Sequence, residues 1–537
     1  MNAIKNVLIV GGGTAGWLTA GFLAKQLGGP QQQAVHITVV ESSDIPTIGV
    51  GEGTFPSIRG TLSLLGIDEA RFLRECSATF KQGIKFVDWV RPAGSVGTDH
   101  YFHPFSLPSQ RSQGLELLPY WLLGAAGGDV AFAEAATMQK KIADAHRGPK
   151  RLSDGDYLGP MNYAYHFDAG RFATLLCKHA QSLGVQRQIA TVQRVELAPD
   201  GSIAALHTAE AGRLEADLYI DCSGFRATLI GDALGAPFRD VNDVLFVDRA
   251  LAMQVPYERP DAPIPSYTIS TAHESGWTWD IGLQERRGIG YVYSSRYTDD
   301  ARAEAVLRQY VGPQGEGVSA RPLQLRVGYR ETQWIKNCVA VGLSGGFVEP
   351  LEASGIGVIE TAAFLISFLF PRDGNLAPVA KQFNTLMVAR YERIVNFVKL
   401  HYCLSQRRDN AFWTDNCNPA SIPEALQEQL AMWRHRPPHR LDFISDLEMY
   451  PPTSWQYVLH GMEYGCDISA SRAAYPRMEE AMREFQTIRQ VSQQALADLP
   501  PHRALIEQMC ARPSQKPAQQ APSRSFAHPS LLTTKLL

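Results

Sequence analysis

A glycine-rich loop near the start of the chain constrains the fold more than any other feature. A short apolar run from Asn6 to Val10 leads into Gly-Gly-Gly-Thr-Ala-Gly-Trp, and a helical pattern follows through Leu27. A second β-branched run, His-Ile-Thr-Val-Val-Glu, ends at Glu41. Strand, glycine turn, helix and strand in this order predict a βαβ unit.

The loop matches the GxGxxG pattern of dinucleotide-binding folds. In that pattern the first glycine permits a tight turn, the second lets the backbone approach a pyrophosphate, and the third allows close packing of helix and strand. The helix N-terminus presents unpaired N–H groups to the phosphates. An acidic residue at the end of the second strand is placed to accept hydrogen bonds from a ribose hydroxyl. We therefore predict that the cofactor is bound by Gly11, Gly13, Thr14, Ala15, Gly16 and Glu41.

Two further glycine turns favour FAD over NAD as the cofactor. One ends the apolar run from Leu218 to Gly224, and the other follows the run from Asn337 to Gly342. Flavoproteins of this type return to the cofactor with several distant segments. The acidic end of the second strand also favours FAD or NAD over NADP.

The remaining pattern predicts an α/β fold with a helical C-terminal part. We expect a helix over 165–182, a hairpin over 189–208, mainly short strands over 245–295 and a long helix over 356–370. The expected organisation is a Rossmann-type FAD-binding module interleaved with a β-rich substrate platform over residues 1–370, followed by a mostly helical region over 371–510 that covers the substrate site. Residues 511–537 contain a Pro-, Gln- and Ser-rich stretch and are expected to form a flexible tail.

Composition excludes several other classes of protein. The net charge of -3 and the scattered Lys and Arg residues give no reason to expect binding to nucleic acid or to a membrane surface. Eight cysteines lie far apart without a CxxC pair or zinc spacing, which fits a reducing cytoplasm. His100 and His103 lack a third ligand at sensible spacing, so we expect no metal and interpret His103 and Phe105 as pocket-lining residues.

Several longer motifs resemble those of the flavin-dependent tryptophan halogenases. They cover most of residues 5 to 370 in the order of that family. They are Gly-Gly-Gly-Thr-Ala-Gly-Trp and the segments Ile48 to Ile58, Ala78 to Trp89, Gly276 to Gly282 and Gly345 to Gly357, with shorter similarities at His100 to Phe105 and Tyr165 to Phe172.

The resemblance implies a two-component halogenase. A separate flavin reductase supplies reduced FAD, oxygen and halide then yield hypohalous acid, and this acid travels through the protein to a lysine beside an aromatic substrate. The position of that lysine falls on Lys81 and that of the catalytic glutamate on Glu352. The halide-binding backbone amides fall on Ser354 and Gly355, and the flavin-lining positions on Val50, Leu343 and Ile356.

These residue types suit that chemistry. Free hypohalous acid reacts unselectively, so a lysine that holds the oxidant by a hydrogen bond or as a haloamine confers selectivity. Electrophilic attack leaves a cationic ring, which a carboxylate can stabilise and deprotonate. Simpler interpretations remain open: Lys85 competes with Lys81, Glu352 can be a helix N-terminal acid, and Trp277 and Trp279 can serve packing alone.

The chain departs from the family pattern in three places. Gly282 stands where the family has proline, and Ala353 where it has serine. The stretch from Leu441 to Gly461 lacks the tyrosine pair that clamps the amino acid, although Trp455 can still line a pocket. We therefore expect indole, a simple indole derivative or another electron-rich aromatic as substrate rather than free tryptophan.

Two other functions and the oligomeric state stay open at this point. A flavin monooxygenase that hydroxylates an aromatic would share the fold without needing halide, and a catalytically silent flavoprotein would bind FAD or ligand and give no product. A halide requirement separates these alternatives. Dimers are common in such families, and no stretch of the sequence decides whether this chain forms a homodimer.

Overall fold

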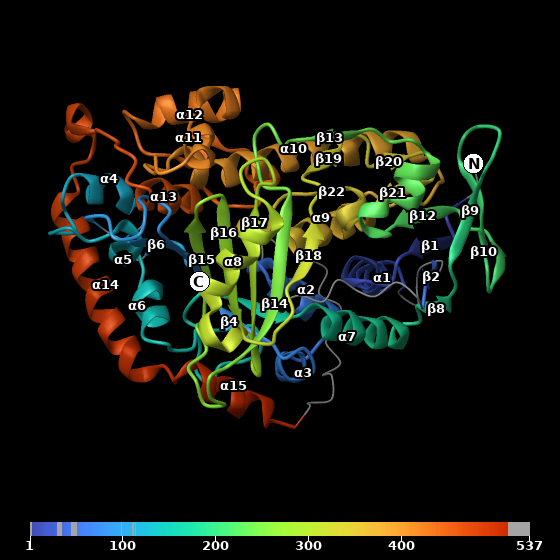
Figure 1. Ribbon diagram of the computed structural model, residues 1–537, viewed down its shortest axis with the longest axis horizontal. Helices are drawn as coiled ribbons and strands as arrows, with labels where there is room; N and C mark the ends of the chain where they lie inside the picture. Colours follow the sequence, from blue (N-terminus) through green and yellow to red (C-terminus); the bar gives the residue numbers. More distant parts are fainter. Residues whose placement is uncertain are drawn as a thin grey trace.

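The βαβ unit expected from the glycine loop is present in the computed structural model (Figure 1). Strand β1 (Asn6–Val10) leads into helix α1 (Thr14–Leu27), and β2 (His36–Glu41) returns parallel to β1. The structure describes residues 3–28, 35–43, 51–97, 99–109, 112 and 114–513. Val50 and residues 514–537, the greater part of the expected tail, lie outside the described residues.

The βαβ unit belongs to a mainly parallel sheet of six described strands in the order β20-β21-β12-β1-β2-β8. The strand pairs within β21-β12-β1-β2-β8 are parallel, and β20 pairs antiparallel with β21. The added strands are β8 (Gln186–Ile189), β12 (Leu218–Asp221), β20 (Trp334–Ile335) and β21 (Cys338–Ala340). The expected hairpin is also confirmed, as β9 (Val192–Leu197) and β10 (Ile203–Thr208) pair antiparallel and β11 (Gly212–Leu214) extends them.

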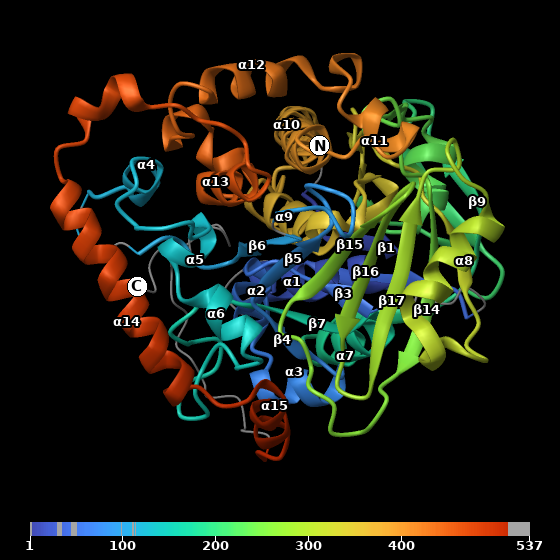
Figure 2. The same cartoon turned by 60° about the vertical axis from the view of Figure 1, so that its left-hand side comes forward.

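A second, mostly antiparallel sheet stands beside the first and forms the β-rich platform (Figure 2). Its described strands run in the order β18-β14-β17-β16-β15-β5-β6. They are β5 (Gly83–Val87), β6 (His100–Pro104), β14 (Arg249–Pro256), β15 (Thr268–His273), β16 (Gly276–Gly282), β17 (Arg286–Tyr293) and β18 (Arg321–Gln324). A small sheet of β13 (Phe238–Asp240), β19 (Gly328–Arg330) and β22 (Gly346–Phe347) completes this part.

A three-stranded antiparallel sheet packs against the platform sheet and corrects one expectation. The helix expected over 165–182 begins only at α7 (Ala169–Ser182), because the preceding residues form β7 (Ala164–Asp168). This strand pairs on one side with β3 (Gly51–Gly53) and on the other with β4 (Thr79–Lys81). The Asp168 side chain accepts a hydrogen bond from the Arg171 backbone N–H and so caps the helix at its true start.

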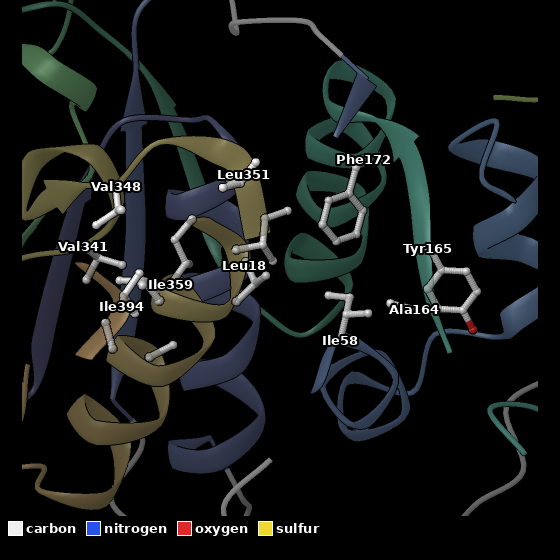
Figure 3. Packing of buried hydrophobic residues seen from close by; sticks show 14 of the residues in the cluster. Leu18, Ile58, Ala164, Tyr165, Phe172, Val341, Val348, Leu351, Ile359 and Ile394 are labelled. Carbon is white, nitrogen blue, oxygen red and sulfur yellow. The ribbon is translucent and has the colours of Figure 1, made fainter. Parts of the chain in front are cut away.

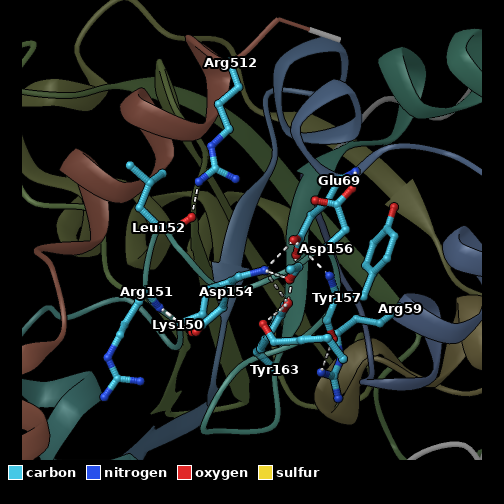
Figure 4. Close-up of polar contacts among 12 residues, drawn as sticks. Arg59, Glu69, Lys150, Arg151, Leu152, Asp154, Asp156, Tyr157, Tyr163 and Arg512 are labelled. Carbon is cyan, nitrogen blue, oxygen red and sulfur yellow. Dashed lines mark hydrogen bonds and ion pairs between the residues drawn. The ribbon is translucent and has the colours of Figure 1, made fainter. Parts of the chain in front are cut away.

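A buried polar network supports this small sheet (Figure 4). The Lys150 ammonium lies 2.7 Å from a carboxylate oxygen of Glu69, and both side chains are fully buried. The hydroxyls of Tyr163 and Tyr165 donate to the other oxygen of Glu69. Because each member has partners, the network avoids the cost of an unpaired buried charge and fixes β7 beside the strand that carries Lys81.

Helices cover the sheets and form most of the C-terminal part, which is drawn in orange and red in Figures 1 and 2. The longest helix, α10 (Leu376–Cys403), packs on α9 (Ser354–Phe368). Helix α9 starts two residues before the expected boundary at 356. The other helices are α2 (Ser57–Leu65), α3 (Glu69–Glu75), α4 (Leu117–Leu122), α5 (Phe132–Ala136), α6 (Gln139–Asp144), α8 (Asp300–Val311), α11 (Ala411–Asn416), α12 (Glu424–Trp433), α13 (Pro452–Gly461), α14 (Met478–Asp498) and α15 (His502–Cys510).

The main hydrophobic core joins the βαβ unit to the later helices. Figure 3 shows Leu18 of α1 and Ile359 of α9 side by side, with Val341, Val348 and Leu351 close to them. All five side chains are buried. Burial of a large aliphatic side chain is worth about 1.5–3 kcal/mol, so this packing fixes the start of α9 against the glycine loop.

Candidate functional site

A cavity of about 610 Å³ lies where the two large sheets meet. Its wall combines the glycine loop after β1, the end of β2, the inner face of the platform sheet and the first turn of α9. Most of the predicted site residues line it, namely Gly11, Gly13, Thr14, Ala15, Glu41, Lys81, Leu343, Ser354, Gly355 and Ile356. Segments far apart in the sequence therefore converge on one space.

The glycine loop has the shape that a dinucleotide requires. Gly11 has a φ of 115°, and a Cβ there would lie 2.2 Å from the backbone oxygen of Cys222. A Cβ at Gly16 would lie 1.9 Å from the Gly11 oxygen, whereas a Cβ at Gly13 would meet nothing within 4 Å. The first and last glycines thus hold the loop against its neighbours, and the middle one leaves open space beside the helix N-terminus. These residues fit the FAD that the sequence predicts.

Glu41 lines the cavity at the end of β2 and is held on two sides. Its carboxylate accepts hydrogen bonds from the Trp17 indole at 3.2 Å and from the Arg187 guanidinium at 2.5 Å. A Cβ at Gly12 would collide with the Glu41 carboxylate. A side chain at position 12 is therefore excluded because Glu41 occupies its place.

Lys81 and Lys85 differ sharply in environment. Lys81 is 1% exposed, reaches the cavity, and places its ammonium 5.2 Å from the centroid of the Phe105 ring. Burial lowers the pKa of Lys81 to about 8, although the nearby charge of Glu352 opposes this shift. Lys85 instead is partly exposed and pairs with Asp144 at 3.7 Å. Of the two candidates, only Lys81 has access to the cavity.

Glu352 is buried between two histidines. Its carboxylate oxygens lie 3.0 and 3.1 Å from Nδ1 of His103, and one oxygen lies 3.1 Å from Nε2 of His401. Burial alone would raise the pKa of Glu352, but the two histidines outweigh it and lower the pKa to about 2. The Tyr101 hydroxyl in turn lies 2.6 Å from Nδ1 of His401. The carboxylate is therefore charged and held in one orientation.

The first turn of α9 supplies backbone donors to the cavity. Ala353, which stands where the family has serine, adopts a left-handed conformation with φ of 54°, and the helix begins at Ser354. The first N–H groups of a helix have no intrahelical partner. Ser354 and Gly355 therefore present N–H groups and the positive end of the helix dipole where an anion can bind.

The three predicted pocket residues meet in an aromatic cluster next to Glu352. The His103 and Phe105 rings are 6.3 Å apart, and Phe397 lies 5.9 Å from His103 and 5.0 Å from Trp455. Tyr450 stacks on Phe397 at 4.1 Å. Within the described part of the chain, the buried Trp455 indole nitrogen has no hydrogen-bond partner. The cluster thus combines aromatic faces with one unused donor.

Two features of the site escaped the sequence analysis. His401 and Phe397 lie on α10, where their spacing resembles that of any helix packed in a core. Glu349, three residues before Glu352, accepts hydrogen bonds from the Trp277 indole at 3.2 Å and from the Tyr402 hydroxyl, and burial raises its pKa to about 7. Trp277 is therefore tied to a carboxyl group, while Trp279 lines the cavity.

The presence of glycine at position 282 is explained by the residues packed around it. A Cβ at this position would lie 2.9 Å from both an Ile264 methyl group and the Tyr257 hydroxyl. The space that a side chain would need is filled by these neighbours, so the departure from the family proline is compensated by packing.

Other site types receive no support from the described residues. They contain no group of three or more His, Cys, Asp or Glu side chains that could hold a metal ion. No helix among the described residues is both long and apolar enough to cross a membrane. All eight cysteines fall in the described part of the chain and are free thiols.

Comparisons with known proteins agree with the fold and identify the family. A family model described as tryptophan halogenase matches residues 6–475. The chain is 36% identical over 475 residues to the tryptophan 6-halogenase SttH of Streptomyces toxytricini, covering 85% of this chain and 88% of that protein.

Solved structures give the same result. A tryptophan halogenase from Shewanella frigidimarina has a TM-score of 0.89 at 39% identity and covers 95% of this chain and 98% of its own. BrvH, a flavin-dependent halogenase from Brevundimonas sp. BAL3, has a TM-score of 0.83 at 35% identity, with 94% and 99% covered. The predicted class, a flavin-dependent halogenase with an α/β fold, is confirmed. The chain belongs to the tryptophan halogenase family.

Proposed function

We propose that the protein uses reduced FAD, oxygen and chloride or bromide to halogenate a small indole-like aromatic. The observation that carries this proposal is the shared cavity, which joins the glycine loop to Lys81 and to the first turn of α9. When bound, reduced FAD from a separate reductase would react with oxygen and halide to supply hypohalous acid. The nucleotide part would be held by Gly11, Gly13, Thr14, Ala15 and Glu41, with Gly16 packed against Gly11 to support the turn. Leu343 and Ile356 would contact the flavin.

The residues of the chain then control where the oxidant goes. The backbone N–H groups of Ser354 and Gly355 hold the halide, since anions bind at helix N-termini. Lys81 receives the hypohalous acid and donates a hydrogen bond to its oxygen, which makes the halogen more electrophilic. The aromatic substrate lies among His103, Phe105 and Trp455, beside the lysine. Substrate and oxidant thus meet away from bulk water.

Glu352 completes the reaction at the ring. Attack by the halogen leaves a positive charge on the ring, and a carboxylate whose pKa is about 2 is ionised and ready to stabilise it. The same carboxylate accepts the ring proton. His103 and His401 hold it in one orientation during both steps.

A halide requirement tests the proposed reaction against aromatic hydroxylation. We expect the protein, given FAD, a flavin reductase, NADH, oxygen, bromide and indole, to form a product with the isotope pair of bromine in its mass spectrum. Omission of bromide should abolish that product. A hydroxylated indole that forms equally well without halide would establish the monooxygenase instead, and bound FAD without any product would indicate a silent flavoprotein.

The aromatic cluster predicts a preference for indole over tryptophan. The rings that contact Trp455 belong to Phe397, Trp433 and Phe443. None of the three carries a charge that could balance an ammonium or carboxylate group, and the Trp433 indole N–H already donates to Asp442. Burying the zwitterionic part of tryptophan there without partners would cost several kcal/mol. We expect kcat/KM for indole to exceed that for tryptophan by about tenfold or more, measured by product chromatography. Better turnover of tryptophan would contradict this substrate assignment.

The glycine loop predicts separable effects on folding and on FAD binding. Gly13→Ala places a methyl group in open space, so the melting temperature of the protein without FAD should change little. That space is where we place the pyrophosphate, so the Kd for FAD should rise by about tenfold or more. Gly16→Ala is the contrasting variant, because its Cβ meets the Gly11 oxygen and should destabilise the fold itself. Equal FAD affinity of Gly13→Ala and wild type, measured by fluorescence titration, would refute the placement.

A further inference from the structure

The wall of the cavity beside Lys81 contains Thr268, which contacts the buried His166, and the proposed mechanism does not yet use either side chain. The position that a Cβ would take at Gly53 lies 3.1 Å from Nζ of Lys81, 3.6 Å from Oγ1 of Thr268 and 3.4 Å from a ring carbon of His166. Gly53, Lys81 and Thr268 all line the cavity. The lysine ammonium and the threonine hydroxyl therefore face the same point, with no side chain between them.

Strand pairing fixes this arrangement. In the small sheet His166 of β7 stands opposite Gly53 on one side and opposite Thr79 on the other. Thr268 is the first residue of β15 in the platform sheet and contacts His166 across the junction, with Nε2 and Oγ1 2.8 Å apart. Because both partners are buried within sheets, neither has the freedom to turn away.

The environment of His166 determines the direction of this hydrogen bond. Within the described part of the chain, the buried Nδ1 of His166 has no partner. A buried N–H without an acceptor is rarer than a buried acceptor without a donor, so the ring proton belongs on Nε2. Burial lowers the pKa of His166 well below its usual value, and the charge of Lys81 lowers it further, so the ring stays neutral. His166 then donates to Thr268, whose own hydroxyl proton is free to point into the cavity.

We propose that Thr268, oriented by His166, donates a second hydrogen bond to the hypohalous acid and so guides the acid to Lys81. This inference rests on the proposed halogenase function. Two donors on either side of Gly53 hold the oxygen of the oxidant, while the halogen points toward the aromatic cluster. Thr268 is thus a catalytic residue that touches the oxidant, and His166 is a positioning residue.

The atoms balance without any further reagent. The bond between oxygen and halogen breaks as the bond between halogen and ring carbon forms. The oxygen leaves as hydroxide and takes a proton from the Lys81 ammonium to become water. Glu352 takes the ring proton and releases it to solvent, and the Lys81 amine takes up a proton from solvent to become an ammonium again. Thr268 and His166 end unchanged, since they only donate hydrogen bonds.

The test measures how the hypobromous acid is divided between indole and a trap in solution. Wild type, Thr268→Val and Thr268→Ser receive FAD, reductase, NADH, bromide and indole, together with a water-soluble 1,3-diketone that is brominated by free hypobromous acid. For Thr268→Val we expect oxygen consumption close to wild type and bromoindole per oxygen consumed lower by about tenfold, the effect of one lost hydrogen bond to a charged or polarised group. The brominated diketone should rise correspondingly, and Thr268→Ser should restore the wild-type ratio.

Two further variants control for folding and burial. Thr137→Val removes a buried hydroxyl that donates to the Ala133 oxygen and accepts from the Gln139 backbone N–H, away from the cavity, and should leave the ratio unchanged. Gly53→Ala keeps both donors but inserts a methyl group 3.1 Å from the lysine nitrogen, and should repeat the loss of oxidant. This variant provides the test if Thr268→Val does not fold.

The outcomes separate the two proposals. A wild-type ratio in Thr268→Val and in Gly53→Ala, with wild type brominating indole, would overturn the role of Thr268 and leave the halogenase function intact. If wild type brominates neither indole nor the diketone, the halogenase function itself fails, and the role of Thr268 with it.

Discussion

Lys81→Ala is expected to lower the rate of halogenation by about 10³-fold, within the range for loss of a positioned proton donor. Oxygen consumption and FAD binding should persist, because Lys81 lies on β4, apart from the glycine loop after β1, and acts only on the oxidant. The oxidant would then escape into solution. Measuring halogenated indole beside hypohalous acid trapped in solution distinguishes this result from loss of oxidant formation.

The matched control is Lys85→Ala. Lys85 lies in the same motif but on the protein surface beside Asp144, so its removal should cost less than about 1 kcal/mol of stability and leave halogenation near wild type. Equal loss of product in both variants would show that the motif serves folding rather than chemistry. Unchanged halogenation by Lys81→Ala would remove the lysine from the mechanism.

The protonation of Lys81 predicts the pH dependence in wild type. Burial lowers its pKa to about 8, so the ammonium form dominates below that pH and is lost above it. If the ammonium is the donor, the halogenated product formed per oxygen consumed falls as pH rises through about 8. An increase over the same range would favour the neutral amine and a haloamine instead.

Glu352→Gln is expected to lower the rate of halogenation by about 10²-fold or more, because the amide can neither balance the ring cation nor accept its proton. Slower deprotonation should also raise the deuterium isotope effect at the ring carbon that is halogenated. The substitution keeps the shape of the side chain between His103 and His401. Loss of fold is therefore not expected to explain the effect, and circular dichroism checks this.

Glu360→Gln provides the control, a buried carboxyl on α9, the helix that begins two residues after Glu352. Burial raises the pKa of Glu360 to about 7, and its carboxyl group accepts a hydrogen bond from the Ser57 hydroxyl at 2.5 Å. Because Glu360 does not line the cavity, the isotope effect should stay at its wild-type value. A rate near wild type for Glu352→Gln would mean that the carboxylate only supports the histidines.

The fold was predicted most accurately where the local sequence determines the backbone conformation. The glycine loop was predictable because a tight turn between an apolar strand and a helix leaves glycine as the residue without a clashing Cβ, as Gly11 and Gly16 show. The helix over 165–182 was wrong at its start because Ala164–Asp168 pairs as a strand with β3 and β4, which are distant in sequence. A local sequence pattern carries no information about such distant strand partners.

The sequence by itself determined the βαβ unit, the family, and Lys81 and Glu352 as candidates, since these depend on contiguous motifs. Only the tertiary structure decided which lysine is buried and has a pKa of about 8, and which histidines hold the carboxylate. His401 comes from a helix beyond every motif, and Thr268 meets His166 only where two sheets join. Burial, charge pairing and hydrogen-bond direction depend on neighbours in space, and those neighbours are set by packing rather than by any local pattern.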